Sequence, residues 1–435
     1  MASKCFKLVG LALFLFNITV VNVFAEGAKE EELADLKTQV RELLKRIEKL
    51  EAEQFNSKEE SKKAGEELKK VKEGQTGSAA SKVDLANSLS KLKIKGRAAL
   101  GFFDSGKAGS YPAGSFEMPD AKLQFAFQAD AINAIVLRFN LNNATSQSPL
   151  LDFFYLQSKN FIPALKDSPF SLETRLGRFK LGFGEETWSD NSIEGVLPSN
   201  SVGKVGGIDE GIETAGKIKL DKLNLQPLGW VLSVSNGNSG VGSDSSAGKA
   251  FMGKLYHSPI KPLYLSASYY DSGDLGTQNA EMSIAGLISR PTGTNNWQRK
   301  VWETDARYDF GKGDKPMTVP LFSDSRAVMS LAYGGFHDLA ASERSGNFGF
   351  LEGIYNLNKK FYVAARFSSV DLSGDTTASL NSVTANRYER YSLGGGYRCS
   401  DNIILKLSYD WNKQSGSHTE DADDNLLSAL VSAQF

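Results

Sequence analysis

Cysteine is nearly absent from this sequence, which contains only Cys5 and Cys399. Because Cys5 lies in a segment that we expect to be removed, one cysteine would remain, and an internal disulfide is excluded. Histidine is almost as scarce: there are three, and none belongs to a recognisable nucleophile motif. Without a general base or a cluster of metal ligands, the sequence favours neither an enzyme nor a metal or cofactor site.

Long apolar runs are also lacking after residue 25, so no segment reaches the roughly 20 residues that a membrane-spanning helix needs. The first 25 residues have the pattern of a signal peptide, in which Lys4 and Lys7 precede an apolar stretch and Ala25 ends a small-residue cleavage site. Cleavage predicts an exported chain, and a retained anchor is the alternative. The net charge is only −1, so no nucleic-acid partner is expected.

Residues 26–73 are highly charged, and their apolar residues recur at alternating steps of three and four. This spacing predicts a short coiled coil, and a single solvated helix is the alternative. Residues 74–91 are rich in Gly, Ser and Ala and are predicted to form a linker. The predicted coiled-coil seam consists of Leu33, Leu36, Val40, Leu43, Ile47 and Leu50.

From residue 92 to residue 435, apolar and polar residues alternate in segments of about ten, which is the period of a β-strand. We predict sixteen strands, joined by links that are alternately short and long, as in a transmembrane β-barrel. The last segment shows the pattern clearly, although Leu430 is an apolar residue on its polar face. Its apolar face, which we interpret as a C-terminal barrel signal, consists of Leu427, Ala429, Val431, Ala433 and Phe435.

Alternation alone also fits a soluble β-sandwich, whose outer faces meet water. Three observations favour a membrane barrel: whole charges on the polar faces, aromatic residues such as Tyr270, Trp297 and Trp302 near strand ends, and the export signal. Closure would leave no unpaired strand edge in lipid. The sequence therefore predicts an all-β, 16-stranded antiparallel transmembrane β-barrel preceded by a short α-helical coiled coil. We expect it in the outer membrane of a Gram-negative bacterium, with its N-terminal segment in the periplasm.

Several segments resemble the phosphate-selective porin O/P family of Gram-negative outer membranes. The most specific is RLGRFKLGFGEET at residues 175–187, and LKIKGRAALGFF at 92–103 and DEGIETAG at 209–216 also match. The resemblance covers most of residues 92–435 and implies a sixteen-stranded barrel, homotrimers, and anion uptake through a constricted pore. Family members and related porins can carry a periplasmic N-terminal coiled coil, which residues 31–54 match.

The strand period assigns fifteen basic and nine acidic side chains to the inner face of the predicted barrel. This excess favours a modest preference for anions. The nine carboxylates depart from the strongly basic pores of the family's phosphate-selective members, so phosphate selectivity does not follow. The basic candidates for the pore lining are Lys93, Lys95, Arg97, Lys122, Arg138, Arg175, Lys217, Lys219, Lys254, Arg307, Arg326, Arg366, Arg390, Arg398 and Lys406.

The long segment 184–207 has two interpretations: an inward constriction loop or an ordinary external loop. Arg178 and Lys180, just before it, have the wrong alternation for the inner face, unless a bulge at Gly177 re-aims the strand. An inward loop would make the constriction partly acidic. Its charged residues are Glu185, Glu186, Asp190, Glu194 and Lys204.

The sequence predicts a porin: a water-filled channel for passive uptake of small anionic solutes, phosphate-like ions among them. Two alternatives stay open. One is an uptake barrel for a larger solute such as a siderophore, and the other is a structural anchor whose coiled coil tethers the barrel to the cell wall. The expected partners are outer-membrane lipid, small anions and further copies of the chain in a homotrimer.

Overall fold

The computed structural model describes residues 90–142, 150–162, 168–220, 225–238, 248–287, 291, 295–311, 325–340, 343–373, 379–380, 383–416 and 421–435. The predicted signal peptide (1–25), the coiled coil with its seam (26–73) and nearly all of the linker (74–91) lie outside the described residues. Within the described ranges, no helix is long and apolar enough to cross a membrane.

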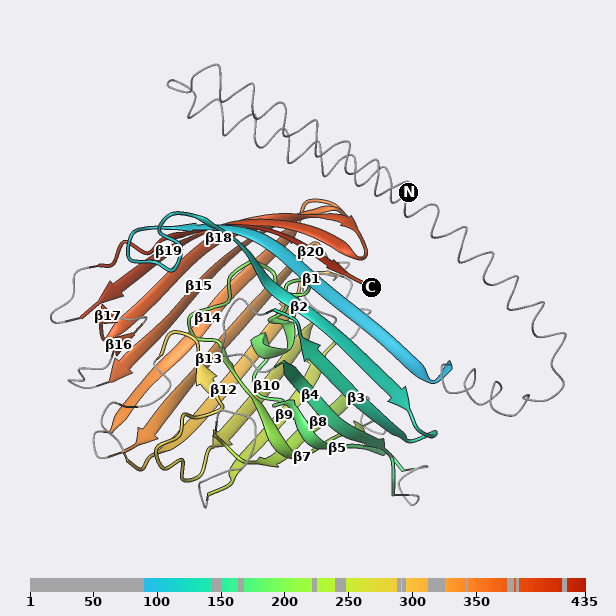
Figure 1. Ribbon diagram of the computed structural model, residues 1–435. Coiled ribbons are helices and arrows are strands. Elements are labelled where there is room, and N and C mark those ends of the chain that lie inside the picture. The colour runs from blue at the N-terminus through green and yellow to red at the C-terminus, as the bar shows by residue number, and fades with distance from the viewer. Residues whose placement is uncertain are drawn as a thin grey trace, which may run out of the picture. The chain divides into compact units, whose positions relative to one another are not determined.

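Sixteen antiparallel strands form a closed barrel in which each barrel strand pairs with the next one along the chain (Figure 1). The predicted all-β fold and the number of barrel strands are therefore confirmed. The barrel strands are β1 (Leu92–Ser105), β2 (Ser115–Gln128), β3 (Asn133–Asn140), β4 (Leu151–Lys159), β5 (Phe170–Lys180), β7 (Ile208–Leu220), β8 (Leu225–Ser235), β9 (Ala250–Ile260), β10 (Leu263–Asp271), β12 (Gln298–Asp309), β13 (Ala327–Leu339), β14 (Arg344–Asn356), β15 (Phe361–Ser373), β18 (Arg387–Ser400), β19 (Ile403–Ser415) and β20 (Leu426–Gln434).

The barrel closes where β20 pairs with β1. The amide of Gly96 donates to the carbonyl of Phe435 at 3.2 Å, and the amide of Phe435 donates back to the carbonyl of Gly96 at 2.9 Å. A Cβ at position 96 would lie 2.3 Å from the Phe435 ring, so a larger residue there would displace this exposed terminal ring.

The two faces of the strands differ as the alternation predicts. On β19, Leu407 and Trp411 point outward and are exposed, whereas Ser408 and Asp410 point inward and are buried. On β20 and at the residue after it, the outward residues are the five of the predicted C-terminal signal: Leu427, Ala429, Val431, Ala433 and Phe435.

Two of the aromatic residues expected near the membrane interface lie elsewhere. Tyr270 is fully buried inside the barrel, where its hydroxyl donates to the carbonyl of Gly237 at 3.3 Å. Trp297 is also buried, and its indole N–H donates to the carbonyl of Gln278 at 2.8 Å. Trp302 is on the outer surface, as expected. The polar group on each buried ring donates to a backbone carbonyl, which offsets the cost of removing that group from water.

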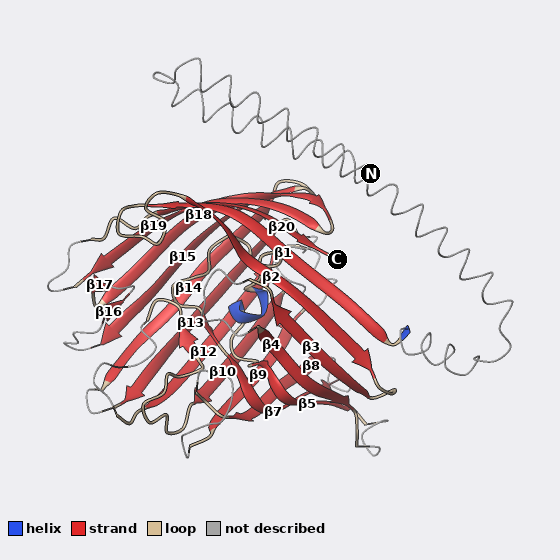
Figure 2. Cartoon of the chain, viewed as in Figure 1, coloured by secondary structure: helices blue, strands red, loops and turns tan. Residues whose placement is uncertain are grey.

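Short strands and one short helix lie in the connections between barrel strands (Figure 2). The connection before β12, one of the long links of the alternating pattern, folds back onto the connection before β7. Its β11 pairs with β6, and Met282, Ile284 and Leu287 enter an apolar cluster inside the barrel with Phe179. These elements are β6 (Val205–Gly206), β11 (Ser283–Ile284), β16 (Ser379–Leu380), β17 (Val383–Thr384) and the 3₁₀ helix η2 (Glu186–Ser189).

Candidate functional site in the barrel lumen

The segment between β5 and β7, residues 181–207, folds into the barrel, and its helix η2 lies inside the ring of strands in Figure 2. It enters through Leu181 and Phe183, which are fully buried in the interior apolar cluster. Further along, Ile193 and Leu197 belong to a second buried cluster with residues of β14, β15 and β19. Of the two interpretations of this segment, the inward loop is therefore correct. We call residues 181–207 the inward loop.

Four of the predicted pore-lining cations hold this loop rather than face open space. Lys254 donates to the carbonyl of Gly184 at 2.5 Å, and Arg366 donates to the carbonyl of Ser199 at 2.9 Å. The loop has almost no regular structure, so its buried carbonyls need donors from outside it.

The other two anchors come from β18 and β19. Arg390 donates to the carbonyl of Asn200 at 3.0 Å. Lys406 is only 3% exposed and donates to the carbonyls of Ser192 at 2.7 Å, Ile193 at 3.2 Å and Gly195. We call Lys254, Arg366, Arg390 and Lys406 the anchor cations.

Asp190 and Glu185, two of the four acidic residues of the inward loop, are paired with cations, so the constriction is less acidic than the number of its carboxylates suggests. Asp190 lies between Lys180 at 2.6 Å and Lys204 at 2.7 Å. Burial acts to raise the pKa of Asp190, but the two ammonium groups outweigh it and hold the pKa at about 2. Glu185 contacts Lys254 at 2.6 Å and accepts a hydrogen bond from Tyr264 at 2.5 Å.

A cavity of about 470 Å³ lies between the wall formed by β1 to β3 and the inward loop. The wall cations are held by wall carboxylates: Arg97 contacts Asp120 at 2.6 Å, and Asp152 contacts Lys122 at 2.7 Å and Arg138 at 2.6 Å. We call this the basic cavity. The cations that line it are Arg97, Lys122, Arg138, Lys180 and Lys204.

Lys180 reaches the basic cavity although its alternation predicts the outer face. Gly177 has a φ of +128°, a backbone conformation that favours glycine, and the register of β5 with its neighbours continues through it without a shift. The bulge hypothesised at Gly177 is therefore absent, and Lys180 reaches the cavity from a strand whose register is unbroken. Beyond this point Arg178 pairs with Glu210 at 2.7 Å.

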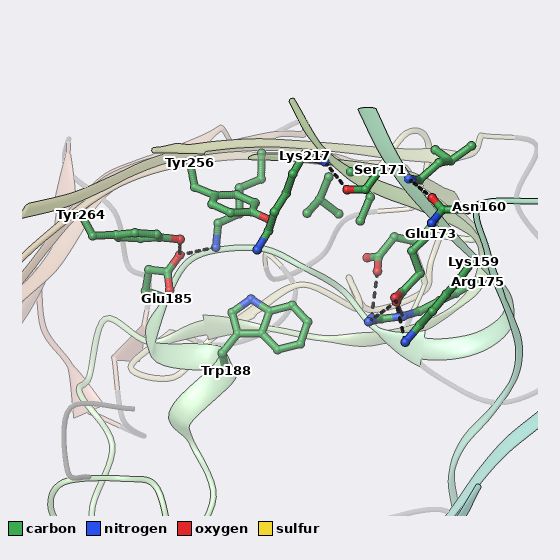
Figure 3. A pocket seen from close by; sticks show the side chains of 16 residues that line it. Lys159, Asn160, Ser171, Glu173, Arg175, Glu185, Trp188, Lys217, Tyr256 and Tyr264 are labelled. Atoms are coloured by element: carbon green, nitrogen blue, oxygen red, sulfur yellow. Dashed lines mark hydrogen bonds and ion pairs between the residues drawn. The ribbon is translucent and has the colours of Figure 1, made fainter. Parts of the chain in front are cut away.

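A second cavity, also of about 470 Å³, lies against β5, β7, β9 and β10, and Figure 3 shows the side chains that line it. Arg175 lines this cavity and contacts Glu173 at 2.9 Å and Glu213 at 3.1 Å. Lys217 and Trp188 project into the space from opposite sides (Figure 3). We call this the aromatic cavity, because Trp188, Tyr256 and Tyr264 all line it.

The remaining basic candidates are spread along the lumen and its rim. Lys93, Lys95 and Lys219 are exposed near the barrel end where β1 begins and β7 ends. Arg307 lines a small space beside the inward loop together with the anchor Arg366. Arg398 lies at the end of β18 and donates to the side chain of Asn356 at 2.8 Å.

Arg326 is a correction to the predicted pore lining. It precedes the first residue of β13 and is exposed. Its guanidinium donates to the hydroxyl of Tyr355 at 2.6 Å and lies 5.3 Å from the centre of that ring, which is on the outer face of β14. The strand period fails here because it holds only within a strand, and Arg326 lies beyond its end.

Solved structures match the barrel, although no protein-family model matches the chain and no curated protein matches it in sequence. An anion-selective porin from Comamonas acidovorans is 12% identical, and the match covers 79% of this chain and 99% of that chain with a TM-score of 0.50. The outer membrane channel DcaP of Acinetobacter baumannii is 12% identical over 79% and 97% of the two chains, also with a TM-score of 0.50. The chain has the fold of an outer-membrane porin. OmpT, an outer membrane protein of Vibrio cholerae, is 10% identical with the same TM-score and covers 79% and 97%.

At these identities the likeness concerns the porin fold alone, and the resemblance to the phosphate-selective porin O/P family stays a prediction. Within the fold, three contributors to the lumen have no signal in the strand alternation: Trp188, Glu281 and the apolar cluster around Met282. The last had a sequence signal, because the stretch EMSIAGL at 281–287 is apolar within an otherwise polar link. Trp188 had only its aromatic character in an inward loop as a signal.

Proposed function

We propose that this chain is an outer-membrane porin of a Gram-negative bacterium, a water-filled channel for passive uptake of small anions. The observation that carries the proposal is the basic cavity, where five cations meet at the inward loop. The acids that line the same cavity are Asp120, Asp190 and Glu281. Burial raises the pKa of Glu281 to about 7, so near neutral pH it carries only part of a charge. Asp152 at the wall also pairs with Lys122 and Arg138, so five cations face three full carboxylate charges and one partial charge, and the local balance is still positive.

A positive constriction raises the local concentration of anions, and walls of low dielectric constant strengthen the effect. The modest excess supports a preference for anions over cations rather than a dedicated phosphate site. Phosphate-like ions are included in this solute class because Lys and Arg side chains suit their oxygens.

The outer surface supports insertion in lipid. Many large apolar side chains on the outward strand positions are exposed, among them Leu100, Leu255 and Leu393. A surface of this kind is unfavourable in water but suits the hydrocarbon layer. We extend the proposal to a homotrimer in the outer membrane with residues 26–73 in the periplasm.

A large solute such as a siderophore fits the lumen less well than a small anion. The inward loop crosses the interior and is buried against several strands, and each of the two main cavities measures about 470 Å³. An anchoring role for the N-terminal segment is compatible with conduction and is a separate proposal.

Reversal potentials in planar bilayers across a KCl gradient test the proposed function. We expect steady conductance with chloride more permeant than potassium. A triple variant, R97Q/R138Q/K204Q, is expected to lose this preference, whereas the matched triple variant K359Q/K360Q/K413Q, whose lysines lie outside the lumen, keeps it. A wild-type channel that prefers potassium, or purified protein that does not conduct, contradicts the proposal.

A further inference from the structure

The aromatic cavity brings together three aromatic side chains from three separate elements. Trp188 comes from η2 of the inward loop, Tyr256 from β9 and Tyr264 from β10. The rings of Tyr256 and Tyr264 lie 6.1 Å apart with 31° between their planes. Trp188 remains 40% exposed although it lies inside the barrel. Its ring therefore faces the open space of the cavity, as Figure 3 shows.

Tyr264 is held in place rather than free to rotate away. The hydroxyl of Tyr264 donates to Glu185, the same carboxylate that contacts Lys254. The backbone amide of Trp188 donates to the carbonyl of Glu185 at 3.2 Å, so the loop that carries the indole is fixed to the same point. An aromatic surface that is already ordered loses little entropy when a ligand binds.

The charges around the aromatic cavity cancel except for one. Arg175 is matched by Glu173 and Glu213, and Lys254 by Glu185. Lys159 is 3.9 Å from Glu173, at the limit of an ion pair.

Lys217 is the exception: its ammonium makes no ion pair or side-chain hydrogen bond with the described residues, and its side chain is exposed towards the cavity. The indole N–H of Trp188 likewise has no acceptor among the described residues. Both donors point into the same space (Figure 3). A bound group with one negative charge and hydrogen-bond acceptors would satisfy both of them.

We propose that the aromatic cavity binds planar aromatic monoanions, of which benzoate is the simplest. The aromatic ring lies against Trp188 and Tyr256, and the carboxylate contacts the ammonium of Lys217. The inference rests on the proposed channel, because the solute reaches the cavity through the lumen, and it narrows the solute class from small anions to aromatic ones. A cationic aromatic solute fits less well because the nearby carboxylates are already paired.

Block of the single-channel current by benzoate, compared with cyclohexanecarboxylate, tests the inference. The two anions have the same charge, but only benzoate offers an aromatic face. We expect half-block at an about two- to tenfold lower concentration of benzoate. The variant K217Q is expected to weaken benzoate block about fivefold. Its matched control is K219Q, which removes the same charge two residues along β7 and outside the cavity.

The variant W188L is expected to remove the preference for benzoate while cyclohexanecarboxylate block stays as it was. Quenching of tryptophan fluorescence by benzoate in detergent gives a readout that needs no conductance. Of the five tryptophans, only Trp188 lines the cavity, so W188F should lose the quenching.

Equal block by benzoate and cyclohexanecarboxylate in a channel that still prefers chloride would overturn this inference and leave the proposed function standing. Equally strong block by benzylammonium would overturn it as well. Absence of conductance would instead contradict the proposed function. The fluorescence titration alone would then test whether the aromatic cavity binds benzoate. Should W188L fail to fold, the difference in benzoate block between K217Q and K219Q still tests the inference.

Discussion

Two parts of the barrel wall both carry Lys and Arg side chains that point inward, but these side chains make different contacts in the two parts. On β9, β15, β18 and β19, the anchor cations point at backbone carbonyls of the inward loop and are largely enclosed by it. On β1 to β3, Arg97, Lys122 and Arg138 pair with wall carboxylates and line the basic cavity. An inward-facing Lys or Arg can therefore either anchor the inward loop or line a cavity. Its position along the strand does not show which of the two it does.

The difference follows from what lies opposite each part of the wall. The inward loop presents buried carbonyls, which must find donors because an unpaired buried polar group is costly. A long Lys or Arg side chain from a strand reaches these carbonyls without requiring regular structure in the loop. On the open part of the wall, β1 to β3, no carbonyl of the described loop accepts a hydrogen bond from Arg97, Lys122 or Arg138. Carboxylates orient these cations instead, and their remaining charge acts on the cavity.

The largest effect is expected from removing an anchor cation. Lys406→Met leaves three loop carbonyls without their donor and is expected to destabilise the inward position of the loop by about 4 kcal/mol. A detached loop should give higher and noisier single-channel conductance. The matched control Lys413→Met, on the outer face of the same strand, should leave conductance unchanged. Identical traces from both variants would show that Lys406 is not an anchor.

The next largest effect is expected at Glu281, in the connection before β12 that folds back onto the inward loop. Its carboxylate accepts a hydrogen bond from the amide of Ile208 at 2.6 Å. Burial, and then the nearby charge of Asp209, raises its pKa from 4.5 to about 7, while the hydrogen bond from Ile208 and the charge of Arg178 act in the opposite direction. Because the folded pKa lies above the unfolded one, this group favours the folded state most below about pH 4.5 and loses that contribution as the pH rises to about 7.

Glu281→Gln keeps an acceptor for Ile208 but cannot ionise. We expect it to stabilise the folded barrel at pH 8, by up to about 3 kcal/mol, and to have little effect at pH 4. Thermal unfolding in detergent at the two pH values measures this as a rise in Tm at pH 8 only. A shift of the same size at both pH values would mean that the carboxyl is not buried in its neutral form.

The strands and their faces were predictable from sequence because alternation is a local property of each segment. The outward set of β20 and the inward set of β1 follow directly from it. Whether segment 184–207 folds inward was not predictable, because its burial depends on Ile193 and Leu197 meeting strands far along the chain. The same long-range contacts decide which cations become anchors.

Within the candidate site, the strand period brought the right wall cations to the lumen but could not distinguish anchors from cavity-lining residues. It failed at Arg326, beyond a strand end, and at Lys180, beyond a glycine with positive φ. It also gave no indication of the aromatic cavity, since Trp188 lies in the loop and meets Tyr256 only in the folded barrel.

A smaller effect is expected at Gly177, the glycine with positive φ three residues before Lys180 on β5. Gly177→Ala places a Cβ 2.4 Å from the carbonyl oxygen of Phe154 at a φ of +128°, and we expect a loss of about 2 kcal/mol of stability. The control Gly353→Ala, where a Cβ meets nothing within 4 Å, should be neutral or slightly stabilising. Thermal unfolding of the two variants measures the difference, and equal Tm values would exclude strain at Gly177.

The smallest effect is expected on the open part of the wall, where a cation can be removed without disturbing the loop. Arg138→Gln leaves Asp152 paired with Lys122, so the Tm should change little. A unit charge about 6 Å from a passing ion in water contributes about 0.7 kcal/mol, so the permeability ratio of chloride to potassium should fall about threefold. Reversal potentials measure this ratio. A variant with unchanged selectivity but altered current noise would show that Arg138 anchors the loop. The distinction between the two parts of the wall would then be wrong, because Arg138 is the clearest example of a cavity-lining cation.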